Sequence, residues 1–206
     1  MRSLSRLLLA AALSLTACHG RGPVAPPAHH PDPIVAPAVD RAALRARLAE
    51  RRQQVVQRFL AYREARIYPV SPGPGRQHIW LDAFGHLCAA ATLISADWGR
   101  DATVAAVHGN LALRIADVRT GPLADWVLTS GLTKQELVAI QVPPMDYPRE
   151  PAPIDAEAAA LYPLYVEVER QITSQWDENL DLAVERLAAQ PALARAFLAG
   201  ALPPPG

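Results

Sequence analysis

Residues 40–66, DRAALRARLAERRQQVVQRFLAYREAR, decide the fold of this chain. Asp40 is a residue type that commonly caps a helix N-terminus, and apolar side chains then recur at helical spacing. The apolar stripe consists of Leu44, Leu48, Val55, Phe59 and Tyr62, with Val56 and Leu60 on its flank. The segment therefore predicts one long helix that buries a single face against the rest of the domain.

The remaining face of this helix is basic. It carries Arg41, Arg45, Arg47, Arg51, Arg52, Arg58 and Arg63, and the whole segment 40–66 has eight arginines against three acids, a local charge of +5. Residues 146–186 have the opposite character, with ten acids and three arginines, a local charge of −7. Opposite charge patterns favour the pairing of two helices, although each exposed ion pair contributes only about 0–1 kcal/mol. In the alternative, the arginine face meets anionic lipid head groups or a cell-wall polymer.

The acidic segment also has helical spacing. Its apolar residues are Leu161, Tyr165, Val168, Ile172, Trp176, Leu180, Ala183 and Leu187, and they predict a second long helix with Pro163 in its first turn or at a kink. Between the two long helices, Pro122–Thr129 reads as a short helix, and Thr133 with Glu136 forms a capping-box pattern. We expect a mainly α fold: one compact helical domain at 40–206, with two long outer helices and several short buried helices. A small β-hairpin near residues 77–86 is the only strand structure considered.

The densest group of chemically reactive residue types lies at 78–88, HIWLDAFGHLC. His78, Asp82 and His86 stand four residues apart, so one helix would align them on a single stripe where neighbours could share a metal ion. Eight residues of helix separate His78 from His86 by about 12 Å, so one ion would need further ligands such as His108 or Asp117. This interpretation makes the segment part of a small metal-dependent enzyme.

A second interpretation of the same segment is favoured. Asp82 in the first position and Gly85 in the fourth are typical of a type I turn, and a buried helix would then begin near His86 with Cys88 in its first turn. A thiol at a helix N-terminus can become reactive, which keeps a thiol enzyme open as an alternative function. The apolar neighbours of Cys88 favour instead a small buried side chain without catalytic function. No cofactor is predicted.

The N-terminus has the features of an export signal. Arg2 and Arg6 precede the apolar run Leu7–Leu15, which is too short to span a bilayer. The run closes in Leu15-Thr16-Ala17-Cys18, which resembles the bacterial lipobox, and this resemblance implies cleavage after residue 17 and a lipid on Cys18. Residues 18–39 are rich in proline and predict an extended tether.

These features predict a lipid-anchored protein of the bacterial cell envelope. His19 follows the cysteine where an aspartate would favour inner-membrane retention, so by resemblance to known sorting rules the outer membrane is favoured over the inner one. Without residues 1–17 the chain has 18 basic and 20 acidic side chains, a net charge of −2, which argues against a nucleic-acid partner. The partners expected are the membrane, through Cys18, and an envelope protein or the cell wall.

One resemblance extends over residues 45–144. The pattern His-x-Trp-x-Asp-x-x-Gly-x-x-Cys-Ala at 78–89, followed by Asp125-Trp126-Val127 and Ser130-Gly131-Leu132-Thr133, is similar to a family of uncharacterised secreted bacterial proteins. The resemblance implies a folded domain in which the 82–88 segment is a framework element, and it implies no activity. The sequence thus predicts a non-enzymatic binding or structural module, with the metal or thiol enzyme as the alternative.

Overall fold

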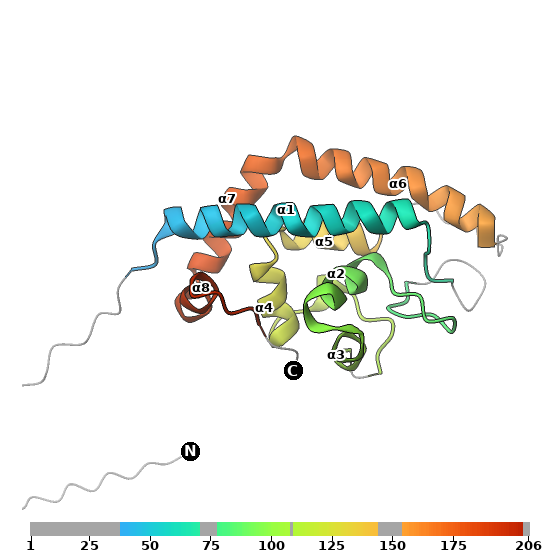
Figure 1. The fold of residues 1–206 in the computed structure, drawn as a ribbon, viewed down its shortest axis with the longest axis horizontal. Helices are drawn as coiled ribbons and strands as arrows, with labels where there is room; N and C mark the ends of the chain where they lie inside the picture. The colour runs from blue at the N-terminus through green and yellow to red at the C-terminus, as the bar shows by residue number, and fades with distance from the viewer. Residues whose placement is uncertain (1–37, 71–77, 108, 144–153, 204–206) are drawn as a thin grey trace, which may run out of the picture. The chain divides into compact units, whose positions relative to one another are not determined.

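Helix α1 (Arg41–Ala65) is the longest element of the fold, and it begins where the sequence predicts. The Asp40 carboxylate accepts hydrogen bonds from the backbone N–H groups of Ala42 and Ala43, each at 3.0 Å, and satisfies two donors that the first helical turn leaves unpaired. The helix ends at Arg66, which adopts the left-handed conformation with φ 54°. The computed structural model describes residues 38–70, 78–107, 109–143 and 154–203 (Figure 1).

Seven further α-helices and one 3₁₀ turn make up the described part of the chain. They are α2 (Ala89–Trp98), α3 (Arg100–Ala105), η1 (Ile115–Asp117), α4 (Pro122–Thr129), α5 (Lys134–Gln141), α6 (Ile154–Ser174), α7 (Trp176–Ala188) and α8 (Pro191–Leu198). The predicted mainly helical single domain is therefore confirmed. The predicted signal peptide at 1–17 and nearly all of the predicted tether at 18–39, including Cys18, lie outside the described residues.

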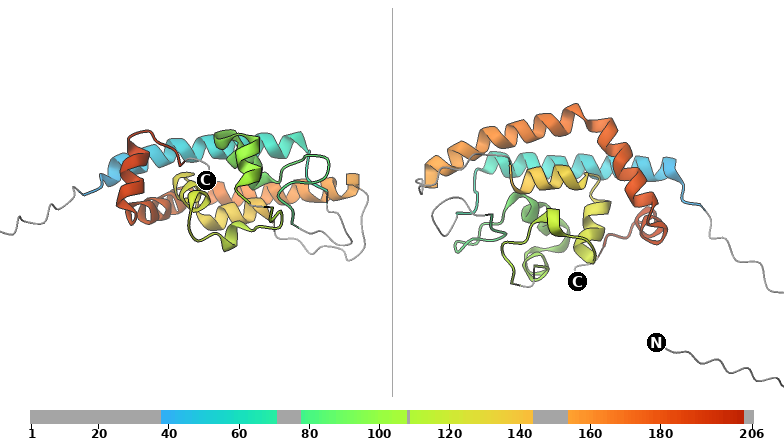
Figure 2. Two further views of the ribbon diagram at one scale, coloured as in Figure 1. Left: turned by 90° about the horizontal axis from the view of Figure 1, so that it is seen from below. Right: turned by 180° about the vertical axis from the view of Figure 1, so that it is seen from behind.

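The two long helices α1 and α6 run along each other (Figures 1 and 2), and in the view of Figure 1 the short helices α2, α3 and α4 lie on the other side of α1 from α6, whereas α5 packs against α6. After α6 the chain turns sharply, and α7 crosses α1 on its way to α8 (Figure 1). No helix in the part of the chain that the structure describes combines the length and apolar composition needed to cross a bilayer.

The apolar stripe of α1 divides between two hydrophobic cores. Leu44 and Leu48 pack with α7 and α8, while Val55, Phe59 and Tyr62 pack with α2, α4, α5 and α6. All five of these side chains are buried, as the helical spacing predicts. Both cores lie within residues 37–206, which form one compact unit, so this unit contains everything that a self-standing domain requires.

The predicted pairing of the basic helix with the acidic segment is confirmed. Arg45 Nε lies 2.7 Å from an Asp181 carboxylate oxygen, and Arg45 Nη2 lies 3.0 Å from Asp177. At the other end of α1, Arg63 pairs with Glu169 of α6. These contacts join α1 to both halves of the acidic segment.

Two expectations about the long helices were wrong. The apolar series from Leu161 to Leu187 belongs to two helices, because the chain breaks at Gln175. Pro163 lies inside α6, which excludes the first turn and leaves the kink of the two positions predicted for it. The basic face of α1 was also misjudged, because Arg51 and Arg52 are buried. Arg52 points inward to the break, whereas Arg51 is buried against Asp97 of α2.

The segment near residues 77–86 forms a turn with one isolated β-bridge, between Leu81 and Leu87, and the described residues contain no longer strand pairing there. The Gly85 N–H donates to the Asp82 carbonyl at 3.1 Å, which closes the predicted four-residue turn, and Gly85 takes φ 87°. The turn interpretation of 82–85 is therefore confirmed over the interpretation as one helix.

Candidate functional site

Asp82 is the centre of the 82–86 turn. Its side chain is 1% exposed and accepts hydrogen bonds from the backbone N–H groups of Val70 (3.0 Å), Phe84 (2.9 Å) and His86 (2.7 Å). His86 Nδ1 completes the set at 3.0 Å from the second carboxylate oxygen. Burial alone would raise the pKa of the Asp82 carboxyl, but these hydrogen bonds and the nearby imidazole bring that pKa below its ordinary value. Asp82 is thus an ionised framework residue. It holds the backbone at Val70 to the backbone of residues 82–86.

The other candidates of this segment do not join Asp82 and His86. His78 Nε2 lies 3.1 Å from the Leu113 carbonyl. Cys88 is 3% exposed and forms the N-cap of α2, where its sulfur accepts from the Ala91 N–H at 3.5 Å, so it lies one position before the first turn in which it was expected. Among the described residues no three His, Cys, Asp or Glu side chains gather closely enough to hold a metal ion.

The remaining two proposed ligands come from outside the 78–88 segment. Asp117 lies in η1, and His108 falls outside the described residues. An open hollow of 510 Å³ adjoins the half-exposed His86, with Arg58 and Arg100 in its wall. Of the predicted set, Asp82 and His86 are in direct contact.

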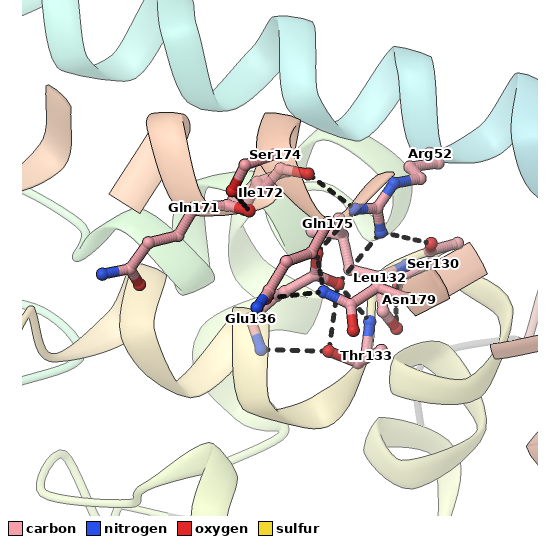
Figure 3. Close-up of polar contacts among 11 residues, drawn as sticks. Arg52, Ser130, Leu132, Thr133, Glu136, Gln171, Ile172, Ser174, Gln175 and Asn179 are labelled. Atoms are coloured by element: carbon pink, nitrogen blue, oxygen red, sulfur yellow. Dashed lines mark hydrogen bonds and ion pairs between the residues drawn. The ribbon is translucent and has the colours of Figure 1, made fainter. Parts of the chain in front are cut away.

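A buried ionic network that the sequence did not reveal connects α1, α5 and the α6–α7 break (Figure 3). Arg52 is 0% exposed and donates to both Glu136 carboxylate oxygens, at 2.9 and 2.6 Å. It also donates to the carbonyls of Gly131 and Ile172, each at 3.2 Å, and its guanidinium lies 4.6 Å from the centre of the Trp176 ring. The interactions with Ile172 and Trp176 hold the chain on either side of the break at Gln175.

Glu136 is held from its other side by the predicted capping box. The Thr133 N–H and hydroxyl donate to it at 2.7 and 3.0 Å, and the Asn179 amide donates at 3.0 Å (Figure 3). A hollow of 110 Å³ adjoins this network near Gln171 and Gln175. Ligand pockets occupy about 300–1,000 Å³, so this hollow is too small for an organic ligand and the network is structural.

A second buried network uses the remaining arginines of the centre of α1. Arg51 and Arg58 both pair with Asp97 of α2, and the Trp126 indole N–H donates to the same carboxylate at 2.7 Å. Burial lowers the pKa of Arg51 from its ordinary value, and the attraction of Asp97 opposes this shift. Because these arginines are engaged inside the domain, α1 does not present the continuous basic face that binding to lipid head groups or a cell-wall polymer would use.

A further hollow lies between η1, α4, α5 and α7, and it has a volume of 590 Å³. Eight of its twelve lining residues are apolar: Ala116, Val118, Ala124, Val127, Leu128, Leu132, Val138 and Ala183. Its volume is within the range of ligand pockets, about 300–1,000 Å³. We refer to this hollow as the α4–α5–α7 groove.

Three cations line the α4–α5–α7 groove: Arg119 after η1, Lys134 at the start of α5, and Arg186 near the end of α7. Lys134 Nζ donates to the Val118 carbonyl at 2.5 Å, which fixes the ammonium at the groove. Burial lowers the pKa of Lys134, and the positive charges of Arg119 and Arg186 lower it further, while Asp117 acts in the opposite direction. Within the described residues neither arginine forms an ion pair.

Sequence reasoning missed this groove because its three cations come from separate elements with no shared spacing. The one available signal was Lys134, the only lysine in a chain whose other cations are arginines.

No family model, curated protein or solved structure matches the chain. The similarity of the 78–89 pattern to a family of secreted bacterial proteins therefore stays a prediction. The roles of the groove residues rest on their geometry and charge alone.

Proposed function

We propose that the chain is a membrane-anchored lipoprotein of the bacterial envelope, with the outer membrane favoured, and that its helical domain is a binding module. The lipobox pattern that ends at Cys18 supports the anchor and the location. The α4–α5–α7 groove is the observation that carries the binding function, because it offers a ligand-sized, mainly apolar surface.

The lining of the groove favours binding over catalysis. General acid–base and nucleophilic catalysis use imidazole, carboxyl, thiol or hydroxyl groups, or an amine. The described lining contains none of the first four, and its one amine, Lys134, is engaged with the Val118 carbonyl. Apolar walls with a few polar groups are what a reversible binding site requires.

The alternative function, a small metal-dependent or thiol enzyme, keeps one supporting observation: the buried Asp82 orients the half-exposed His86 beside an open hollow. Buried Cys88 gives this alternative no accessible nucleophile. If His86→Ala left every property of the protein except folding stability unchanged, the enzyme interpretation would have no remaining support.

The anchor can be tested with two cysteine variants of the full chain. Cys18→Ala removes the residue proposed to carry the lipid, so we expect the protein to leave the membrane fraction and to lose incorporation of radiolabelled palmitate. Cys88→Ala is the matched control, and it should remain lipidated and membrane-bound. A Cys18→Ala protein that is still membrane-bound would contradict the proposed anchor.

The groove can be tested with the neutral fluorophore N-phenyl-1-naphthylamine and the compact unit 37–206. Ala124 is half-buried in the groove wall, so Ala124→Phe should fill the groove and abolish the fluorescence increase. Ala105→Phe, on an exposed position of α3, is the matched control and should behave as the parent protein. Absence of any binding to the parent protein would refute the binding function.

A further inference from the structure

The α4–α5–α7 groove has two chemically different parts. Its walls are apolar side chains of α4, α5 and α7, among them the half-buried Leu128 and Val138. Arg119, Lys134 and Arg186 add positive charge to the same hollow. A ligand that fits both parts must itself be amphipathic.

The two arginines of the groove have no ion-pair partner within the described residues. Around Lys134, the positive charges of Arg119 and Arg186 lower its pKa, and the carboxylate of Asp117 opposes them. The arginines of α1 offer a contrast, because Arg45 and Arg52 are both matched by carboxylates. Cations held near each other beside an apolar surface attract an anion more strongly than cations in open solvent do.

We propose that the groove binds a single-chain anionic amphiphile of the fatty-acid type, with its alkyl chain against α4, α5 and α7 and its anionic head group at Arg119, Lys134 and Arg186. The inference rests on the proposed binding function and names its ligand class. The ligand is a free amphiphile rather than a phospholipid in a bilayer, because one hollow of 590 Å³ serves one chain. Arginine forks and the lysine ammonium together supply several charge-assisted donors to one carboxylate.

The test uses the full chain in isolated membranes and photoactivatable lipids. Diazirine-bearing palmitate and diazirine-bearing hexadecanol share the same chain and differ only in head-group charge. After irradiation, mass spectrometry measures the labelling of peptides from α4, α5 and α7. We expect palmitate to label these peptides about tenfold more than hexadecanol, the effect of roughly one charge-assisted hydrogen bond.

Charge variants identify the head-group site. The triple variant Arg119→Gln, Lys134→Gln, Arg186→Gln should bring the two labels to equal yield, and its circular dichroism should match the parent because all three side chains are exposed or half-buried. Arg114→Gln removes an exposed cation that does not line the groove, and this control should keep the preference for palmitate.

Three results would overturn the inference. Equal labelling of the parent by palmitate and hexadecanol would contradict the anionic head group of the proposed ligand. The groove would then remain a binding site for apolar molecules. If a diazirine-bearing phosphatidylglycerol labelled the groove peptides as strongly as palmitate, the ligand would be a phospholipid of the bilayer instead of a free amphiphile. Persistence of the palmitate preference in the triple variant would place the head group elsewhere. Failure of the proposed function itself is distinguishable, because the neutral fluorophore then shows no binding.

Discussion

Glu136 is the position where one substitution tests how the domain is held together. Its two carboxylate oxygens accept five hydrogen bonds, two from Arg52, two from Thr133 and one from Asn179. Glu136→Gln keeps the shape but removes the charge that balances Arg52, and it turns an NH₂ group toward donors. With side chains 0% and 7% exposed, Arg52 and Glu136 form a buried pair, and breaking such a pair costs about 3–5 kcal/mol.

Urea denaturation followed by far-ultraviolet circular dichroism measures this cost. A loss of about 3–5 kcal/mol corresponds to a fall in melting temperature of roughly 6–20 °C for a domain of this size. Glu169→Gln breaks a pair of the same type, between α1 and α6, at a carboxylate that is 31% exposed, and it should cost less than about 1 kcal/mol. If the free energy of unfolding of Glu136→Gln were within about 1 kcal/mol of the parent's, the buried Arg52–Glu136 pair would not be a main stabilising contact of the domain.

A double variant separates the effect of the charge imbalance from the effect of lost packing. Arg52→Met with Glu136→Leu removes both charges together, and replacing a buried ion pair by apolar residues is often close to neutral. The double variant should therefore be more stable than Glu136→Gln. If the double variant were less stable than that single variant, the hydrogen bonds of Arg52 to Gly131 and Ile172 would contribute more to stability than the balance of charge does.

Further predictions concern the backbone, the turn and the groove. In urea denaturation, Gly131→Ala should destabilise the fold about 1–3 kcal/mol more than Gly121→Ala. Both glycines have positive φ, but of the two only Gly131 has no room for a Cβ, which would lie 2.5 Å from the backbone nitrogen of Arg52. The folded-state pKa of Asp82 is lowered, so its ionisation stabilises the fold above about pH 4 and this contribution is lost as pH falls through the lower folded value. Asp82→Asn should therefore be less stable than the parent at neutral pH, with a difference that shrinks in acid; a constant difference would contradict this. Reductive ¹³C-methylation labels Lys134 as the only lysine, and its NMR titration should give a pKa below the usual lysine value; a usual value would contradict the burial assigned to it.

Local spacing predicted those parts of the structure that local contacts determine. The Asp40 cap, the Thr133–Glu136 capping box and the Asp82–Gly85 turn each depend on residues within four positions of one another. The break at Gln175 could not be predicted in this way, because no glycine or proline marks it. The break lies against Arg52, about 120 residues earlier in the chain, which contacts Ile172 and Trp176 on its two sides.

The same limit applies to the candidate site. The 78–88 segment attracted attention because its His, Asp and Cys side chains are close in sequence, yet the fold assigns Asp82 to a turn and Cys88 to a helix cap. Residue type and spacing indicate which groups could react, whereas burial and partners decide whether they are available. The groove residues have the reverse properties, being unremarkable in sequence and brought together only by tertiary packing.

The distribution of paired and unpaired cations links the fold to the proposed ligand. The basic pattern of α1 predicts partner helices, and the structure neutralises it with acids of α2, α5, α6 and α7. Other cations of the described structure form no ion pair with a carboxylate. Arg119 and Arg186 are two such cations in the described structure, and they line the α4–α5–α7 groove together with Lys134. Since charge repulsion at this hollow opposes folding, a bound anion would stabilise the domain, and palmitate should raise the melting temperature of the parent but not of the triple glutamine variant.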